Sequence, residues 1–276
     1  MSTKMQRMRK TIIFIAFALF LLACTGLAQE HTTMSAECGP KGKLSITVKE
    51  GTHWLHSFRV MWVVKVTNAP QMAFWLEDAE GNFVATMYVT HRTATQDWRA
   101  SPGEKKGEIR RPSSLPIWMH THRQGGIQSK ASCAACHQKV KTEDKSTEGH
   151  PLLDAITGAT PKWGFTREWA ILEDFKPGTY IVRAEINHSK DFNEHYRKGL
   201  VVGDPNYSGG KMGSGQPSML WEGTLEIGET ETSTALEKVG HGHPSGKTGD
   251  VYPDLNTLTS ALDIVEAIQV KYIPPQ

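Results

Sequence analysis

Alternating apolar and polar positions occur in both halves of the chain and predict short β-strands. Residues Leu44–Val48 alternate as a half-buried strand does, and Phe58–Val66 is a longer, more apolar run that is typical of a central strand. Residues Ala73–Glu77 and Phe83–Val89 flank Asp78–Asn82, where Gly and Asn tolerate a positive φ. This region is therefore predicted to be a hairpin.

The second half of the chain has the same pattern. Strands are predicted at Thr179–Ile186, after a Pro-Gly turn, at Met219–Ile227 and near Ile264–Ile273. A weaker helical pattern covers Pro253–Ile264. Short strands separated by turns predict a mainly β chain, folded as an immunoglobulin-like β-sandwich.

One long segment interrupts this pattern. Residues 41–276 are predicted to form a single domain after a flexible linker at 24–40, but about 100–163 form an irregular insertion that is polar and rich in Lys, His, Gly and Ser. A long segment without periodicity inside a compact domain is usually functional or disordered. Because the main candidates for chemistry lie in this insertion, we expect it to be functional.

Residues 1–23 have the pattern of a secretory signal peptide: a basic start, a short apolar run and small residues at the end. The sequence Leu21–Cys24 resembles the lipobox of bacterial lipoproteins, in which Cys24 becomes lipidated and anchors the protein to a membrane. Cleavage after Ala28 would instead release a soluble protein. Either route places the mature chain outside the cytoplasm, and a lipid-anchored periplasmic protein is the preferred prediction.

The charge of the mature chain argues against nucleic acid as a partner. Four of the 31 basic residues lie in the signal peptide, which leaves 27 basic against 29 acidic residues and a net charge of −2. A slightly acidic chain offers no electrostatic attraction to phosphate backbones.

The most specific local motif places Cys133, Cys136 and His137 in the spacing of a c-type haem attachment site. The two thiols would form thioethers to the haem vinyl groups, and the adjacent imidazole would bind the iron. Two other interpretations stay open. The cysteines could form a redox-active disulfide, although no thioredoxin-like βαβ pattern surrounds them, or could bind zinc with His137 and a fourth ligand such as Cys38 or His150.

The sixth ligand of the iron is not determined by the sequence. The near candidates are Met119, His120, His122 and His150. The apolar stretch Leu115–Trp118 before them is expected to cover the porphyrin. An axial His would give a lower potential than Met.

A second attachment motif follows in the same insertion. The sequence resembles the flavinylation motif that bacterial FMN transferases recognise, Asp-x-x-Ser/Thr-Gly-Ala-Ser/Thr, and the matching positions are Asp154, Thr157, Gly158, Ala159 and Thr160. By that resemblance Thr160 would carry FMN through a phosphoester bond. The small residues before Thr160 would keep the approach to its hydroxyl clear, and the glycine would allow a turn that projects it. The alternative is an ordinary turn of small residues.

Taken together, the chain resembles predicted periplasmic proteins of domain-of-unknown-function family 2271. The resemblance covers Leu44 to about Trp221 and is carried by Ala73–Gly81, Arg111–Trp118, Asp154–Pro161 and Tyr180–His188. It implies an exported β-sandwich, in a family whose members are often encoded near flavin transferases and membrane reductases. A haem motif is not general to that family, so the haem prediction rests on its own spacing.

These observations predict an extracytoplasmic electron carrier rather than an enzyme. It would exchange electrons with a membrane redox donor or acceptor, after the cytochrome c maturation machinery and an FMN transferase had attached its cofactors. The rival is a zinc-stabilised binding or adhesion sandwich. Asp154, His188 and Glu194 have ordinary explanations as turn or surface residues, and His241 and His243 are expected in a flexible loop with at most weak metal binding.

Overall fold

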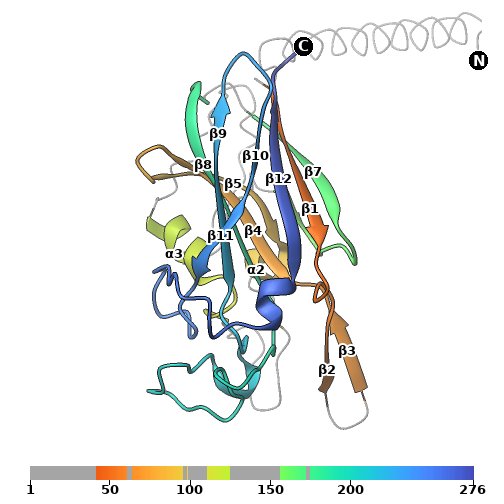
Figure 1. Ribbon diagram of the computed structural model, residues 1–276, viewed down its shortest axis with the longest axis vertical. Coiled ribbons are helices and arrows are strands. Elements are labelled where there is room, and N and C mark those ends of the chain that lie inside the picture. The colour runs from red at the N-terminus through yellow and green to blue at the C-terminus, as the bar shows by residue number, and fades with distance from the viewer. Residues whose placement is uncertain (1–41, 61–63, 96–97, 99–110, 125–155, 172–174) are drawn as a thin grey trace, which may run out of the picture.

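The computed structural model describes residues 42–60, 64–95, 98, 111–124, 156–171 and 175–276. Two mainly antiparallel sheets face each other as a β-sandwich, and a separate two-stranded hairpin projects beyond one end (Figure 1). The prediction of a mainly β sandwich is confirmed. The immunoglobulin-like topology stays a prediction.

The smaller sheet has the strand order β10-β12-β1-β7. Its strands are β1 (Lys43–Glu50), β7 (Phe165–Ala170), β10 (Thr232–Ala235) and β12 (Val265–Ile273). Every second side chain of β1 is buried, namely Leu44, Ile46 and Val48, while the residues between them face outward. One face of this sheet therefore packs on the core and the other meets solvent.

The larger sheet has the order β11-β9-β8-β4-β5-β6. Its strands are β4 (Gln71–Asp78), β5 (Phe83–Thr90), β6 (Ile156–Gly158), β8 (Gly178–Asn187), β9 (Met219–Ile227) and β11 (Glu237–His241). Alternate residues of β4, such as Phe74, join the core between the sheets, whereas Ala73 and Trp75 join a second apolar cluster. The central strand β4 is consequently buried on both faces.

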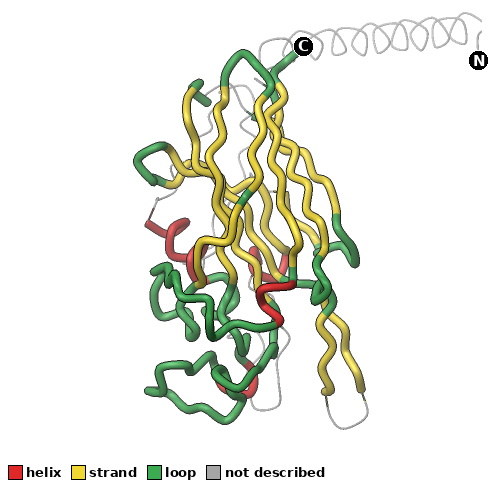
Figure 2. Tube along the Cα trace, viewed as in Figure 1, coloured by secondary structure: helices red, strands yellow, loops and turns green. Residues whose placement is uncertain are grey.

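Two helices lie against the larger sheet (Figure 2). They are α2 (His91–Thr95) and α3 (Pro116–Gln124), and two short 3₁₀ helices, η1 (Gly210–Met212) and η2 (Ser260–Asp263), lie in the connections. In the second apolar cluster, Leu115, Ile117 and Trp118 pack against Trp75. Among the described helices, none has the length and apolar character needed to cross a membrane.

Several strand predictions are confirmed, including those at Leu44–Val48, Met219–Ile227 and the hairpin of β4 and β5. The prediction of one central strand at Phe58–Val66 is wrong. The segment folds back as β2 (His56–Val60) and β3 (Val64–Asn68), which pair only with each other. Arg59 lies opposite Lys65 in this pair and both are exposed, as a hairpin outside the sandwich allows.

Two further expectations are corrected. Within the insertion at about 100–163, the described residues 116–124 form α3 and 156–158 form β6, and the other described residues are turns or loop. Leu115–Trp118 cannot cover a porphyrin, because these side chains are buried in the protein's own second cluster. The helical pattern at Pro253–Ile264 yields only the four residues of η2.

Candidate functional site

The flavinylation-like motif lies at the edge of the larger sheet. Strand β6 pairs with β5 in parallel, with Gly158 beside Thr90 and Thr157 beside Val89. Ala159 and Thr160 follow directly after the strand and lead to β7. The sheet thus fixes the backbone of Thr157 and Gly158, while Asp154 lies outside the described residues.

The side chain of Thr160 is half-buried and hydrogen-bonded. Its hydroxyl donates to the carbonyl oxygen of Pro70, which lies immediately before β4. The same hydroxyl lies close enough to the phenol of Tyr88 in β5 to lower the pKa of that phenol. The proposed attachment point therefore lies where three segments of the chain meet.

A pocket of about 230 Å³ opens beside this threonine. Gly158, Ala159 and Thr160 form part of its wall. The other lining residues come from the end of β3 to the start of β4 (Asn68, Ala69 and Gln71), from the end of β5 and α2 (Thr90, His91 and Arg92), from the segment after α2 (Trp98) and from the loop after β8 (Ser189). The pocket thus combines a hydroxyl nucleophile, a guanidinium, an imidazole and an indole, which suits an anionic ligand with an aromatic part.

Gly158 leaves space in this pocket. A Cβ added to Gly158 would meet no atom within 4 Å, and the residue does not have a left-handed backbone. The expected reason for glycine, a turn that projects Thr160, is therefore wrong, because Gly158 ends a strand. The expectation of a clear approach agrees with the open space at Gly158.

Tyr88 is a member of this region that the sequence did not single out. Its side chain is 2% exposed and packs with its ring centroid 6.1 Å from Phe74 and 5.8 Å from Phe165. Its hydroxyl forms no hydrogen bond in the described part of the chain. The Thr160 hydroxyl, which donates to Pro70, nevertheless lies close enough to the phenol to affect its pKa. Burial raises the pKa of the phenol, while Arg167 and Thr160 lower it.

Cys133, Cys136, His137 and His150 lie outside the described residues, as do Cys24 and Cys38.

The structure does describe the other three candidate sixth ligands, all in α3. Met119 packs against the second apolar cluster, and His120 Nε2 lies 3.3 Å from the carbonyl oxygen of Gly246. His122 packs its ring against two aromatic rings, with centroids 5.3 Å from Trp118 and 5.5 Å from Phe83. Burial, followed by the charge of Arg123, lowers the pKa of His122.

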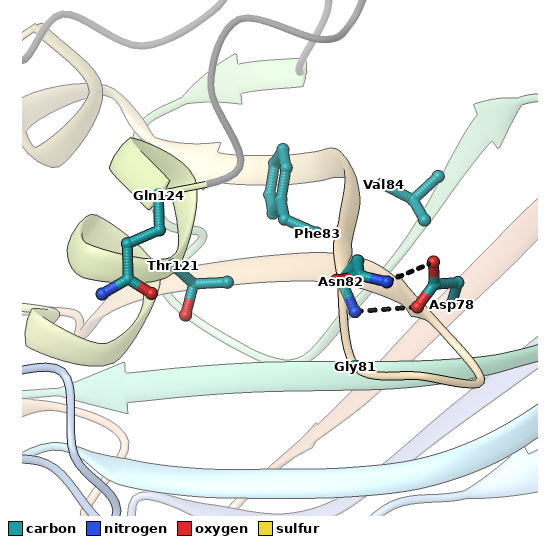
Figure 3. A pocket seen from close by; sticks show the side chains of 7 residues that line it. All are labelled: Asp78, Gly81, Asn82, Phe83, Val84, Thr121 and Gln124. Atoms are coloured by element: carbon teal, nitrogen blue, oxygen red, sulfur yellow. Dashed lines mark hydrogen bonds between the residues drawn. The ribbon is translucent and has the colours of Figure 1, made fainter.

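A second pocket, of about 610 Å³, lies between α3 and the turn that joins β4 to β5 (Figure 3). Phe83 of the hairpin and Thr121 and Gln124 of α3 line it. The hairpin turn is held by Asp78, which accepts bonds from the backbone and side-chain amides of Asn82 at 2.7 and 3.0 Å. This pocket is next to the end of α3, from which the chain continues toward the haem motif.

Helix α3 is attached to the sandwich by a buried carboxylate. Glu185 of β8 is fully buried and accepts hydrogen bonds from the backbone N–H groups of Ile117 and Trp118, at 3.1 and 2.7 Å, and from Ser218 Oγ at 2.5 Å. These N–H groups belong to the first turn of the helix and have no partner within it. Burial raises the pKa of Glu185 to about 7, against the lowering effect of its donors, first Ser218.

The remaining histidines differ from the sequence prediction. His188 is not a surface residue: it is 3% exposed, its Nε2 donates to the carbonyl oxygen of His53 at 2.9 Å, and burial lowers its pKa to about 4. His241 is not in a flexible loop, because it ends β11 and its ring stacks on Tyr252 at 5.5 Å, with His243 beside the same ring. Glu194 is exposed, as predicted. In the described ranges no three His, Cys, Asp or Glu side chains form a group that could hold a metal ion.

Comparison with known proteins adds no relative. No family model, no curated protein and no solved structure matches the chain significantly. The resemblance to family 2271 therefore stays a prediction, and function is argued from the site itself.

Proposed function

We propose that the protein is an extracytoplasmic electron carrier with FMN esterified to Thr160 and haem c bound through Cys133, Cys136 and His137. The observation that carries the flavin part is the pocket beside Thr160, which joins three positions of the attachment motif to Arg92, His91 and Trp98. A plain turn of small residues would not require basic and aromatic side chains from distant segments at its hydroxyl.

The residues around Thr160 fit a flavin phosphate. Arg92 and His91 are suited to the phosphate, and Trp98 offers a surface for an aromatic ring. The open space at Gly158 leaves room for a group bonded to Thr160. At about 230 Å³ the pocket is smaller than the usual 300–1,000 Å³ of a ligand site. It would therefore enclose the phosphate end and leave the ring system accessible to a redox partner.

The bound flavin would supply electron transfer, while the protein binds, orients and shields it. The group transfer itself would form the bond between Thr160 Oγ and phosphorus and break the phosphoric anhydride of a flavin dinucleotide. The adenosine monophosphate would leave, and the hydroxyl proton would pass to solvent. Arg92 would stabilise the negative charge on the phosphate throughout.

The haem part rests on the spacing of the two cysteines and the histidine. Of the described candidates for the sixth ligand, His122 has the strongest support. Its lowered pKa keeps the imidazole neutral, which is the form that binds a metal, and no described residue accepts or donates a hydrogen bond at its ring. Met119 and His120 already have contacts with the fold.

Spectroscopy and peptide mass spectrometry test the proposal on the full chain, expressed in a bacterium that matures cytochromes c and contains an FMN transferase. We expect sharp reduced-haem bands, haem retained after denaturation, and the mass of FMN on the peptide that carries Thr160. Thr160→Ala should abolish the flavin and leave the haem spectrum intact, and Thr166→Ala, at an exposed strand position, should leave both unchanged. A colourless protein that contains zinc would support the rival binding or adhesion sandwich instead.

A further inference from the structure

The phenol of Tyr88 is an unusual group for its position. Its ring fills space between Phe74 and Phe165, a role that Phe would serve equally well. The hydroxyl adds a buried donor without a partner in the described part of the chain. A buried donor that is left unsatisfied destabilises the folded state. Tyr88 therefore requires an explanation other than core packing.

Modification of Thr160 would change the hydrogen bonding beside this phenol. The free threonine has a hydroxyl proton, which it donates to Pro70. An ester at Oγ has no proton, so the bond to Pro70 is lost and the oxygen can only accept. The phosphate adds further acceptor oxygens next to it. The donor best placed to meet the new acceptors is the buried phenol, because the Thr160 hydroxyl lies close enough to it to lower its pKa.

We infer that Tyr88 is a positioning residue that donates a hydrogen bond to the phosphoester at Thr160. The inference rests on the proposed flavin attachment. The phenol is a donor at neutral pH, because its pKa is raised by burial. On modification the Pro70 carbonyl loses the donor at Thr160, and the Tyr88 hydroxyl gains an acceptor there.

This inference predicts that Tyr88→Phe has opposite effects in the two states of the protein. In the unmodified chain, from a host without FMN transferase, the variant removes an unsatisfied donor and should leave Tm unchanged or raise it. In the FMN-loaded chain it removes a hydrogen bond and should lower Tm by about 2–4 °C, the shift expected for about 1 kcal/mol in a domain of this size. The ³¹P resonance of the attached FMN should also shift in the variant.

Tyr196→Phe is the matched control. Tyr196 is equally buried, at 2%, but its hydroxyl lies 2.9 Å from Thr257 Oγ1, a contact that does not involve Thr160. Its replacement should lower Tm by the same amount with and without FMN and leave the ³¹P resonance in place. If Tyr88→Phe lowers Tm equally in both states, or leaves the ³¹P resonance unmoved, the inference is wrong although FMN is attached. If wild-type Thr160 never acquires FMN, the proposed flavin function fails and this inference fails with it.

Discussion

The carboxylate of Glu185 accepts a 2.7 Å hydrogen bond from the backbone N–H of Trp118, and this contact joins a core strand to the first turn of α3. Trp118 in turn donates its indole N–H to Thr86 of β5 at 3.0 Å. Both ends of the contact are buried. The helix that carries three candidate haem ligands is therefore fixed to the sandwich by specific bonds as well as by apolar packing.

Removal of this carboxylate should destabilise the protein. Glu185→Ala leaves two backbone N–H groups and the Ser218 hydroxyl without their acceptor, and we expect a loss of about 3 kcal/mol in the free energy of unfolding. Glu185→Gln keeps one acceptor oxygen and should cost less, about 1–2 kcal/mol. Urea unfolding measures both, with the exposed Glu237→Gln as control. An unchanged midpoint for Glu185→Ala would show that the bonds to α3 do not stabilise the fold.

The raised pKa of Glu185 makes stability depend on pH. The folded protein holds this proton up to about pH 7, whereas the unfolded chain releases it near 4.5. The contribution of this proton to the free energy of unfolding is therefore complete below pH 4.5 and is lost as pH rises through about 7. Within this window the free energy of unfolding falls by no more than about 1.4 kcal/mol per pH unit. The difference in unfolding free energy between wild type and Glu185→Gln should become less favourable to wild type across this window. A pH-independent difference would contradict the raised pKa.

His188 has the opposite dependence. Its folded pKa is lowered to about 4 from 6.5, so the folded protein excludes a proton that the unfolded chain binds. The contribution of neutral His188 to the free energy of unfolding is present above pH 6.5. It is lost as pH falls toward 4, and the total loss is about 3 kcal/mol. His188→Gln should reduce this acid sensitivity in unfolding measurements, whereas replacement of the partly exposed His195 should not. If the acid sensitivity of His188→Gln equals that of wild type, His188 is not the group responsible.

Arg92 should determine how efficiently the flavin is attached. Hydrogen bonds to charged groups contribute about 1.5–3 kcal/mol, so Arg92→Gln should slow the initial rate of FMN incorporation about tenfold or more. Arg92→Lys keeps the positive charge and should recover part of the rate, and the exposed Arg197→Gln should have no effect. The rate is followed by the mass of the Thr160 peptide over time. Equal rates for wild type and Arg92→Gln would remove Arg92 from the phosphate site.

The visible spectrum tests His122 as the sixth haem ligand. His122→Ala should shift the Soret and reduced bands and raise the reduction potential, because a weaker ligand or water replaces an imidazole. His120→Ala is the control, since His120 lies beside Gly246 on the same helix. A shift in the control alone would reverse the assignment of the two histidines.

The sequence predicted the elements whose burial alternates along one strand and failed where burial depends on distant segments. Strand β1 is recognisable because its buried residues are every second one. Residues 115–118 were interpreted as a porphyrin cover, because their true partner, the outer face of β4, is formed by another part of the chain. The apolar run Phe58–Val66 predicts one strand, because such a run carries no signal for where it folds back.

The candidate site could be predicted only in part, for a related reason. A local motif identified Gly158, Ala159 and Thr160, which are adjacent in sequence. Arg92 and Trp98 come from other elements and belong to no motif, so their place in the pocket follows from the sheet alone. In the sequence Tyr88 looks like any aromatic residue of a strand, because only the folded structure shows that its buried hydroxyl has no hydrogen-bond partner among the described residues.

The pairing of β6 with β5 and the attachment of α3 to β8 have a joint consequence for the span between the two cofactors. Both borders of residues 125–155 are held by one sheet, and Cys133 follows the end of α3 by nine residues, which reach at most about 30 Å. Two redox groups attached at Cys133 and Thr160 would be tethered to a single rigid body. Electron exchange between them would then proceed within one molecule, at a rate that does not change on dilution.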